Sequence, residues 1–189
     1  MRSYFRGVFI KIAVKKFIKP KKVPETMALA VTHVILTILI LDLFRHYIFG
    51  LKKFPRYLLV VGGIAGLFPD IDILITWIYN FFTSSQVNFH GTFTHSLLWP
   101  LLFLIIGLFS HYQKNLKWAK IFYVISASWI FHLILDCAFG GYKEYLWPFF
   151  IFNFCPQWGI EKYAISIDAI ILVVWLVHEE MHKMIKDYY

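Results

Sequence analysis

Hydrophobic positions along the chain form five long runs, and the loops at 51–56 and 113–120 between them are short and basic. The runs cover approximately residues 28–49, 57–79, 97–112, 121–139 and 164–177. A helix needs about 20 apolar residues to cross a bilayer, and several runs reach that length only with an end turn that carries His or Asp. A single strand would leave its amides unpaired in lipid, so the runs should be helical. The pattern predicts an all-α, multi-spanning transmembrane helix bundle with about five hydrophobic helices.

Two proline-containing segments interrupt this pattern. Pro69 lies inside the second run and should kink or end the helix there, because proline lacks an N–H and clashes with the preceding turn. Residues 146–159 are aromatic and apolar and contain Pro148 and Pro156. We interpret them as an interfacial or re-entrant loop that packs against the bundle.

Composition supports the membrane assignment and a single domain. Of the 189 residues, 59% are hydrophobic and only 16% are charged, which lies outside the range of ordinary soluble domains. Aromatic residues make up 20%, as suits a protein with wide contact with the membrane interface. No composition shift or long polar linker indicates a second domain.

The net charge of +8 is concentrated at the N-terminus rather than in a nucleic-acid-binding surface, so we expect no specific nucleic acid partner. Eight of the 19 basic residues precede the first run: Arg2, Arg6, Lys11, Lys15, Lys16, Lys19, Lys21 and Lys22. Residues 1–26 are therefore either an amphipathic basic helix on an anionic bilayer surface or a disordered basic tail. Residues 27–189 form the predicted transmembrane domain of a multi-pass cell-membrane protein.

The two cysteines, Cys137 and Cys155, do not have the spacing of a metal-binding pair. One disulfide remains open as an alternative, but two buried thiols are the preferred interpretation. They therefore do not identify the compartment.

Eight His and Asp residues in or beside the hydrophobic runs fall at one membrane face when the runs alternate in direction. This group contains His33, Asp70, Asp72, His90, His95, His132, Asp136 and Asp168. His132 and Asp136 are four residues apart on one helix, so both side chains project from the same side. Thr94 is a candidate N-cap that would place His95 in the first turn of the third helix. The dense basic tail favours a cytoplasmic position for this face.

A metal ion explains this grouping on electrostatic grounds. Each carboxylate at membrane depth costs a few kcal/mol unless it is paired, and four lie near one face without matching Lys or Arg. A divalent cation with neutral imidazoles removes the repulsion. A His/Asp set without Cys suits zinc first, with manganese, iron or nickel as alternatives, and one or two ions fit the number of ligands. An ion with an open position would lower the pKa of bound water and support hydrolysis.

A second motif, His178-Glu179-Glu180-Met181-His182, matches H-E-x-x-H, in which two helical His bind zinc and the Glu is a general base. It lies on the face opposite the main group, and a third ligand would have to come from elsewhere, for example His111. A charged, solvated helix end is the preferred interpretation, with a membrane zinc protease as the lesser alternative.

Four short motifs together resemble the YdjM-like family of membrane-bound, metal-dependent hydrolases. They are Thr32-His33, Gly66-Leu67-Phe68-Pro69-Asp70-Ile71-Asp72, Thr92-Phe93-Thr94-His95-Ser96-Leu97 and His132-Leu133-Ile134-Leu135-Asp136, followed by Trp147-Pro148-Phe149. The resemblance covers residues 27–168 and implies metal ligands at His33, Asp70, Asp72, His90, His95, His132 and Asp136. This family often has Arg where the chain has Gly91, so Lys143 or Lys162 would have to contact an anionic substrate instead.

These features lead to one expected function and two alternatives. The expectation is a hydrolase of a phosphoester substrate, including lipids that diffuse within the bilayer, with Asp72 or Asp136 as general base and membrane lipids as partners. A metal-ion or proton-coupled transporter would use similar residues nearer mid-membrane. A non-catalytic membrane protein would hold a structural metal in a closed ligand shell.

Overall fold

The computed structural model describes residues 30–139, 143–150, 155–156 and 163–181. In chain order its elements are α2 (Ala30–Phe44), the π-helical turn η1 (Arg45–Phe49), α3 (Tyr57–Ala65), the 3-10 turn η2 (Phe68–Asp70), α4 (Ile71–Thr83), the 3-10 turn η3 (Phe93–His95), α5 (Leu98–Tyr112), α6 (Leu116–Ala138) and α7 (Ala164–Met181). Over these residues the fold is helical and has no strand, which confirms the predicted all-α bundle. The predicted basic tail, residues 1–26, lies outside the described residues.

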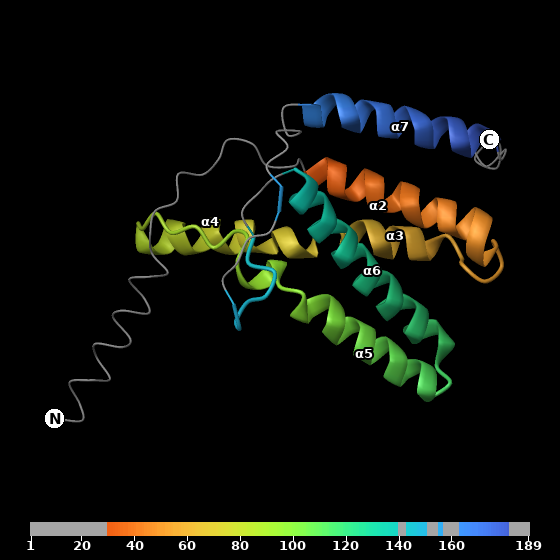
Figure 1. Ribbon diagram of the computed structural model, residues 1–189, viewed down its shortest axis with the longest axis horizontal. Helices are drawn as coiled ribbons and strands as arrows, with labels where there is room; N and C mark the ends of the chain where they lie inside the picture. The colour runs from red at the N-terminus through yellow and green to blue at the C-terminus, as the bar shows by residue number, and fades with distance from the viewer. Residues whose placement is uncertain (1–29, 140–142, 151–154, 157–162, 182–189) are drawn as a thin grey trace.

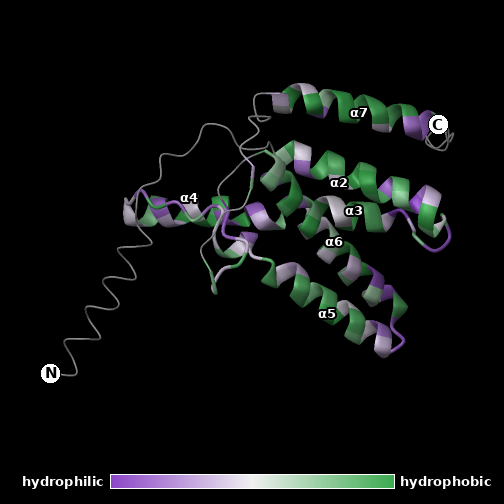
Figure 2. Cartoon of the chain, viewed as in Figure 1, coloured by the Kyte–Doolittle hydropathy of each residue, from purple (hydrophilic) through white to green (hydrophobic). Residues whose placement is uncertain are grey.

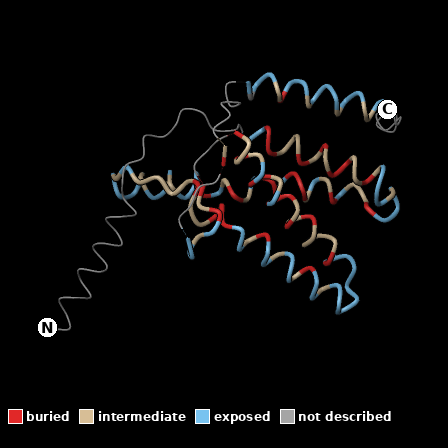
Figure 3. The backbone as a smooth tube through the Cα atoms, in the orientation of Figure 1, coloured by how far each residue is buried: buried red, intermediate tan, exposed pale blue. Residues whose placement is uncertain are grey.

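Three stretches are long and apolar enough to cross a bilayer: Ala30–Phe49, Tyr57–Thr83 and Leu116–Ala138. Helix α5 is apolar but shorter. Hydrophobic residues dominate α2, α3, α5 and α7 (Figure 2), and the outward sides of α5 and α7 are exposed (Figure 3). On these helices Ile105 is 54% and Val173 is 58% exposed. Apolar surface of this kind suits contact with lipid tails.

Pro69 breaks the second hydrophobic run as predicted. Helices α3 and α4 follow one another almost end to end (Figure 1), but η2 separates them, with Pro69 in its middle position. The break places Asp70 at the start of α4 and Asp72 in its first turn. The carboxylates of Asp70 and Asp72 therefore lie close together at the helix break, at the level where α2 begins and α6 ends.

Two glycines allow α3 to approach its neighbours closely. A Cβ atom at Gly62 would collide with the side chain of Leu41 on α2, and one at Gly66 would lie 3.3 Å from the backbone oxygen of His33. Small residues four positions apart let membrane helices pack at short range. This packing matters for function because α2 and α6 carry histidines beside α3.

Helices α5 and α6 form an antiparallel pair joined by a short loop (Figure 1). At their contact Trp99 stacks on Trp129 with ring centroids 6.0 Å apart, and Phe103 packs against the same indole at 5.6 Å. Trp129 also donates from its Nε1 to the backbone oxygen of Thr94, at 3.1 Å. The aromatic contact and this bond hold the segment before α5 against α6.

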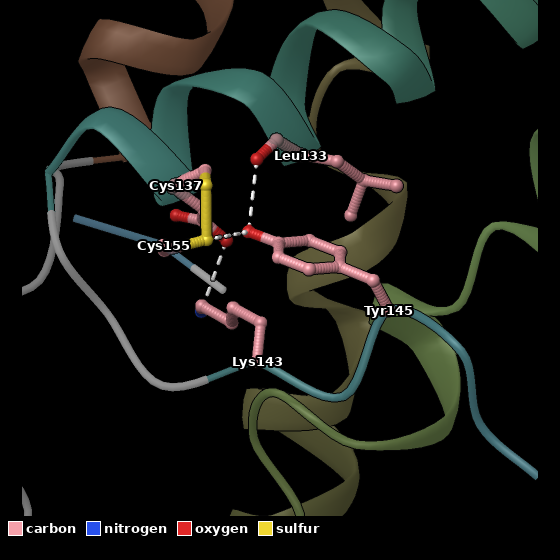
Figure 4. The surroundings of a disulfide bond; sticks show 6 residues. Leu133, Cys137, Lys143, Tyr145 and Cys155 are labelled. Atoms are coloured by element: carbon pink, nitrogen blue, oxygen red, sulfur yellow. Dashed lines mark hydrogen bonds and ion pairs between the residues drawn. A yellow bond between two sulfur atoms is a disulfide. The ribbon is translucent and has the colours of Figure 1, made fainter. Parts of the chain in front are cut away.

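Cys137 and Cys155 form a disulfide, so the preferred interpretation of two buried thiols was wrong (Figure 4). Their Cα atoms lie 4.9 Å apart, within the range that such a bond requires. Sequence spacing did not reveal the pair, because the chain after α6 folds back onto the end of that helix. The bond ties the loop that carries Lys143 and Tyr145 to α6.

The predicted loop at 146–159 is described only in part. Residues 145–149 are turns, and the Trp147 backbone oxygen accepts a hydrogen bond from Ser96 Oγ at 2.6 Å. The Leu97 backbone N–H donates to the Tyr145 oxygen at 2.9 Å. The loop therefore packs on the start of α5. Residues 151–154 and 157–159 of the predicted loop lie outside the described residues.

Candidate metal centre

The seven predicted ligands converge at one end of the bundle. They come from α2 (His33), η2 (Asp70), α4 (Asp72), the segment before α5 (His90 and His95) and α6 (His132 and Asp136). These residues form three overlapping groups, and within each group one ligand atom per residue lies within 4.8 Å of the others. The groups are His33, His132 and Asp136; Asp70, His95 and His132; and Asp72, His90 and His95. The predicted meeting of these residues is present, and their role as ligands stays a prediction.

Three ligand atoms at the centre of this group have the spacing of a metal site. His95 Nε2 lies 3.0 Å from Asp136 Oδ2, His132 Nε2 lies 3.2 Å from the same oxygen, and the two Nε2 atoms are 3.4 Å apart. Atoms at 2.0–2.1 Å from a tetrahedral zinc ion would be roughly 3.3 Å apart. These three atoms therefore fit one divalent ion. Asp70 Oδ1 lies farther out, 3.8 Å from His95 Nε2 and 3.6 Å from His132 Nε2.

Hydrogen bonds on the far side of each imidazole leave Nε2 available for a metal. His132 donates from Nδ1 to the backbone oxygen of Gly66 at 2.7 Å. His95 donates from Nδ1 to Asp72 Oδ2 at 3.1 Å. A second partner of this kind fixes the tautomer and the ring orientation of a ligand histidine. Both rings are fully buried, so the orientation is also held by packing.

Asp72 is engaged by its neighbours on both oxygens. Its Oδ1 lies 2.9 Å from His90 Nδ1, and its Oδ2 accepts from the Gly91 N–H at 3.1 Å and from Thr94 Oγ1 at 2.6 Å. The side chain is fully buried. These contacts favour a role in orienting His90 and His95 over direct binding of metal.

The sequence suggested Thr94 as the N-cap of the third helix, and this prediction was wrong. Thr94 lies in η3, and α5 begins only at Leu98. Its hydroxyl donates to Asp72 instead. A hydrogen bond to a charged carboxylate is stronger than one between a hydroxyl and a neutral backbone amide, so the side chain turns toward the site.

His33 and His90 flank the central atoms. His33 Nε2 lies 3.4 Å from Asp136 Oδ1, and its ring stacks on His132 with centroids 3.8 Å apart. His90 Nδ1 lies 4.0 Å from Asp70 Oδ1. Two imidazoles beside the central group allow a second ion to share its carboxylates.

Lys143 extends from the loop after α6 into the same site (Figure 4). Its Nζ lies 2.9 Å from Asp136 Oδ2 and 3.2 Å from His95 Nε2, and the residue is only 3% exposed. Lys143 therefore reaches the centre, and its contact with an anionic substrate stays a prediction. The other candidate cation, Lys162, lies outside the described residues. Three carboxylates face one described ammonium group, so the site keeps an excess of negative charge.

The electrostatic surroundings of His95, which lies between the membrane-spanning stretches, agree with this excess. Burial disfavours its charged form, but hydrogen bonds to Asp136 and Asp72 outweigh burial and raise the pKa of His95 above its usual range. Carboxylates that hold a proton on an imidazole would hold a divalent cation in the same place.

Gly91 stands where the family pattern often has Arg, and its backbone explains why glycine suits this chain. Its φ is +80°, a region that glycine enters without steric cost. That conformation directs the Gly91 N–H to Asp72. An Arg residue at this position would have a strained backbone. Lys143 is a described cation that contacts the centre instead.

A second cluster, which sequence reasoning missed, lies at the opposite end of the bundle. His178 of the H-E-x-x-H motif has its Nδ1 3.2 Å from Asp42 Oδ2, and His46 Nδ1 lies 3.3 Å from Asp42 Oδ1. The suggested third ligand, His111, lies instead beside Tyr123, with 3.3 Å between Nδ1 and the phenol oxygen. His182 lies outside the described residues. Asp42 lies between Leu41 and Leu43 inside the first hydrophobic run. A carboxylate within a membrane segment is a sequence signal that could have found this cluster.

Asp168, the eighth residue of the predicted face, belongs to none of the groups of three or more ligands found in the described part of the chain. It is buried on α7.

Comparisons with known proteins agree with the membrane assignment. A family model described as YdjM inner membrane protein matches residues 27–186. The inner membrane protein YbcI of Escherichia coli (strain K12) is 32% identical over 122 residues, which are 61% of this chain and 67% of that protein. No solved structure matches the chain. The family match covers every helix that supplies a candidate ligand.

Proposed function

We propose that this chain, which belongs to the YdjM family of inner membrane proteins, is a metal-dependent hydrolase of phosphoesters. One observation supports this most: the Nε2 atoms of His95 and His132 each lie within 3.8 Å of an oxygen of Asp70 and of an oxygen of Asp136. Hydrolysis by metal-activated water is the chemistry that such a nitrogen and oxygen site commonly supports.

The chemistry of the donors suits zinc first. His95, His132 and Asp136 would hold one ion. Asp70 lies beside the two imidazoles, and His33 lies beside His132 and Asp136, where a further ligand is needed. Imidazole with carboxylate and no thiolate fits zinc, with manganese, iron and nickel as alternatives. A divalent ion bound here would polarise a phosphoryl oxygen and lower the pKa of water.

Three surrounding residues would orient the ligands, act as general base and bind the phosphate. Asp72 orients His90 and His95, because both of its oxygens accept hydrogen bonds from the site. Asp136 is therefore the better candidate for general base of the two acids that the sequence indicated. Lys143, whose ammonium group already contacts Asp136, is placed to bind an anionic phosphate.

A lipid phosphoester fits the surface beside this centre. A cavity of about 340 Å³ is lined by Leu97, Ile130, Leu133, Ile134, Cys137, Ala138, Tyr145 and Pro156. Its walls are apolar, and Ile134 is 58% exposed on the lipid-facing side of α6. An acyl chain would fill such a cavity, while Lys143, two residues from Tyr145, would contact the phosphate. Tyr145 and Cys137 line the cavity, and Figure 4 shows both beside Lys143.

The experiment compares phospholipid and water-soluble phosphoester hydrolysis by zinc-loaded protein in nanodiscs. We expect phosphate or phosphoalcohol release by wild type and a fall of at least about 100-fold for the His132→Ala, Asp136→Ala double variant, since removing metal ligands removes the catalyst. His111→Ala, which changes a histidine outside the centre, is the control. Wild type that holds zinc and cleaves neither substrate class would overturn the proposal.

A metal-ion transporter is the second candidate, and one observation favours it. The hydroxyls of Thr37 and Ser128 are buried inside the bundle and have no hydrogen-bond partner among the described residues. Thr37 lies on α2 between His33 and Asp42, so polar groups continue from one cluster toward the other. Uptake of zinc into proteoliposomes, with no hydrolysis of phosphoesters, would support transport instead of catalysis.

A further inference from the structure

Three potential metal ligands meet at the end of the bundle remote from the metal centre. Asp42 lies near the end of α2, His46 in the π-helical turn η1, and His178 near the end of α7. We propose that these three residues form a second binding site for a divalent transition-metal cation, with zinc as the ion to test first.

The geometry of the three side chains fits a shared ion. One ligand atom from each residue lies within 4.8 Å of the other two. Asp42 is fully buried, and the side chains of His46 and His178 are 5% and 11% exposed. The two imidazole rings meet edge to face, with centroids 4.9 Å apart. Two imidazole nitrogens and one carboxylate oxygen are the protein ligands of many zinc sites.

Two of these ligands are four residues apart, at the end of α2 and in the turn η1. In a regular helix the side chains of residues i and i+4 are neighbours, and the π-helical turn at Arg45–Phe49 keeps His46 beside Asp42. His46 Nδ1 lies 2.9 Å from the backbone oxygen of Asp42. If Nδ1 donates this bond, the Nε2 lone pair is the one that binds metal.

Arg45 orients the carboxylate and does not fill the site. Its Nη1 lies 3.3 Å from Asp42 Oδ1, and its Nε donates to the backbone oxygen of Phe54 at 3.1 Å. These bonds fix the guanidinium on one side of the carboxylate. The other oxygen, Oδ2, faces His178 at 3.2 Å and has no hydrogen bond of good geometry among the described residues. Ligand carboxylates in metal sites are usually held in this way.

In this proposal the first histidine of the H-E-x-x-H motif is a ligand of the second site rather than part of a protease motif. This histidine, His178, faces Asp42, with 3.2 Å between Nδ1 and Oδ2. Arg56 lies 3.8 Å from Glu179 Oε2. The competing explanation is an ion-pair contact that fastens α7 to α2, in which the two arginines balance the two acids without any metal.

Metal content separates the two explanations. Purified wild type, His178→Ala, His46→Ala and the control His111→Ala are each loaded with zinc, and zinc is counted per chain by mass spectrometry. We expect both cluster variants to lose about one zinc per chain and His111→Ala to lose none. Equal zinc content in all four proteins, each eluting as wild type does on size exclusion, would overturn the proposal.

The double variant His132→Ala, Asp136→Ala tests independence from the metal centre. We expect it to keep one zinc per chain, which His178→Ala then removes. Cobalt loading of the double variant should give visible bands of a nitrogen and oxygen site that vanish with His178→Ala. A double variant that binds neither zinc nor cobalt would show that the cluster is only an ion-pair contact, whatever the hydrolase assay finds.

Discussion

His95 and Asp72 face each other between η3 and the first turn of α4, with Nδ1 of the imidazole 3.1 Å from Oδ2 of the carboxylate. The carboxylate points the opposite ring nitrogen, Nε2, toward Asp136 and His132. Pairs of this kind orient ligand histidines and raise their basicity.

The Asp72→Asn substitution should weaken zinc binding at the metal centre about 10- to 100-fold, as loss of such a partner typically does. The amide is nearly isosteric but lacks the charge that orients His95 and His90. A competition titration against a chelating dye measures the affinity. Asp168→Asn, a buried carboxylate outside the ligand groups, is the matched control. Equal affinity of both variants and wild type would show that Asp72 does not support the site.

The Lys143→Met substitution should strengthen zinc binding and weaken hydrolysis. The ammonium group lies 2.9 Å from Asp136 Oδ2 and competes with a cation for that oxygen. Without it, the centre holds zinc more tightly, but an anionic phosphate loses its contact and KM should rise. Lys117→Met, at an exposed position on the first turn of α6, controls for the lost charge. Unchanged zinc affinity and KM would remove Lys143 from the site.

The Gly62→Ala substitution should destabilise the bundle by about 1–3 kcal/mol, the usual cost of overpacking. The new methyl group would collide with Leu41. In a Leu41→Ala background the same change should cost clearly less, because the colliding side chain is shorter. Thermal unfolding in detergent of the four proteins of this cycle gives the coupling. Additive effects would show that the two helices do not meet at Gly62.

Replacing both Cys137 and Cys155 by Ser should leave zinc content unchanged and lower turnover. None of the candidate ligands lies on the loop that the bond holds, but Lys143 does. Zinc analysis and a phosphoester assay on the same sample separate these effects. Loss of zinc together with activity would contradict the expected division between the loop and the ligands.

Much of this architecture was available from the sequence because lipid imposes strict limits. The hydrophobic runs had to be helices, Pro69 had to break one of them, and alternating spans placed His33, Asp70 and Asp136 at one end. The structure has each of these features. The family resemblance predicted the same residues, and the family match agrees with it.

The remaining details depend on contacts between distant residues, which periodicity does not contain. The cluster at Asp42 and His178 joins positions 136 residues apart, and the disulfide depends on the path of the chain after α6. Thr94 has the sequence of a helix cap, but a nearby carboxylate attracts its hydroxyl. In each case the position of the side chain depends on a residue distant in sequence, which the local sequence pattern does not reveal.

The Cys137–Cys155 bond has a consequence for orientation. Disulfides persist in the bacterial periplasm and are kept reduced in the cytoplasm. Cys137 follows Asp136 at the end of α6, so the bond would last only if that end of the bundle meets an oxidising compartment. That orientation would oppose the one that the basic residues before the first helix favour, because positive charge is usually retained inside.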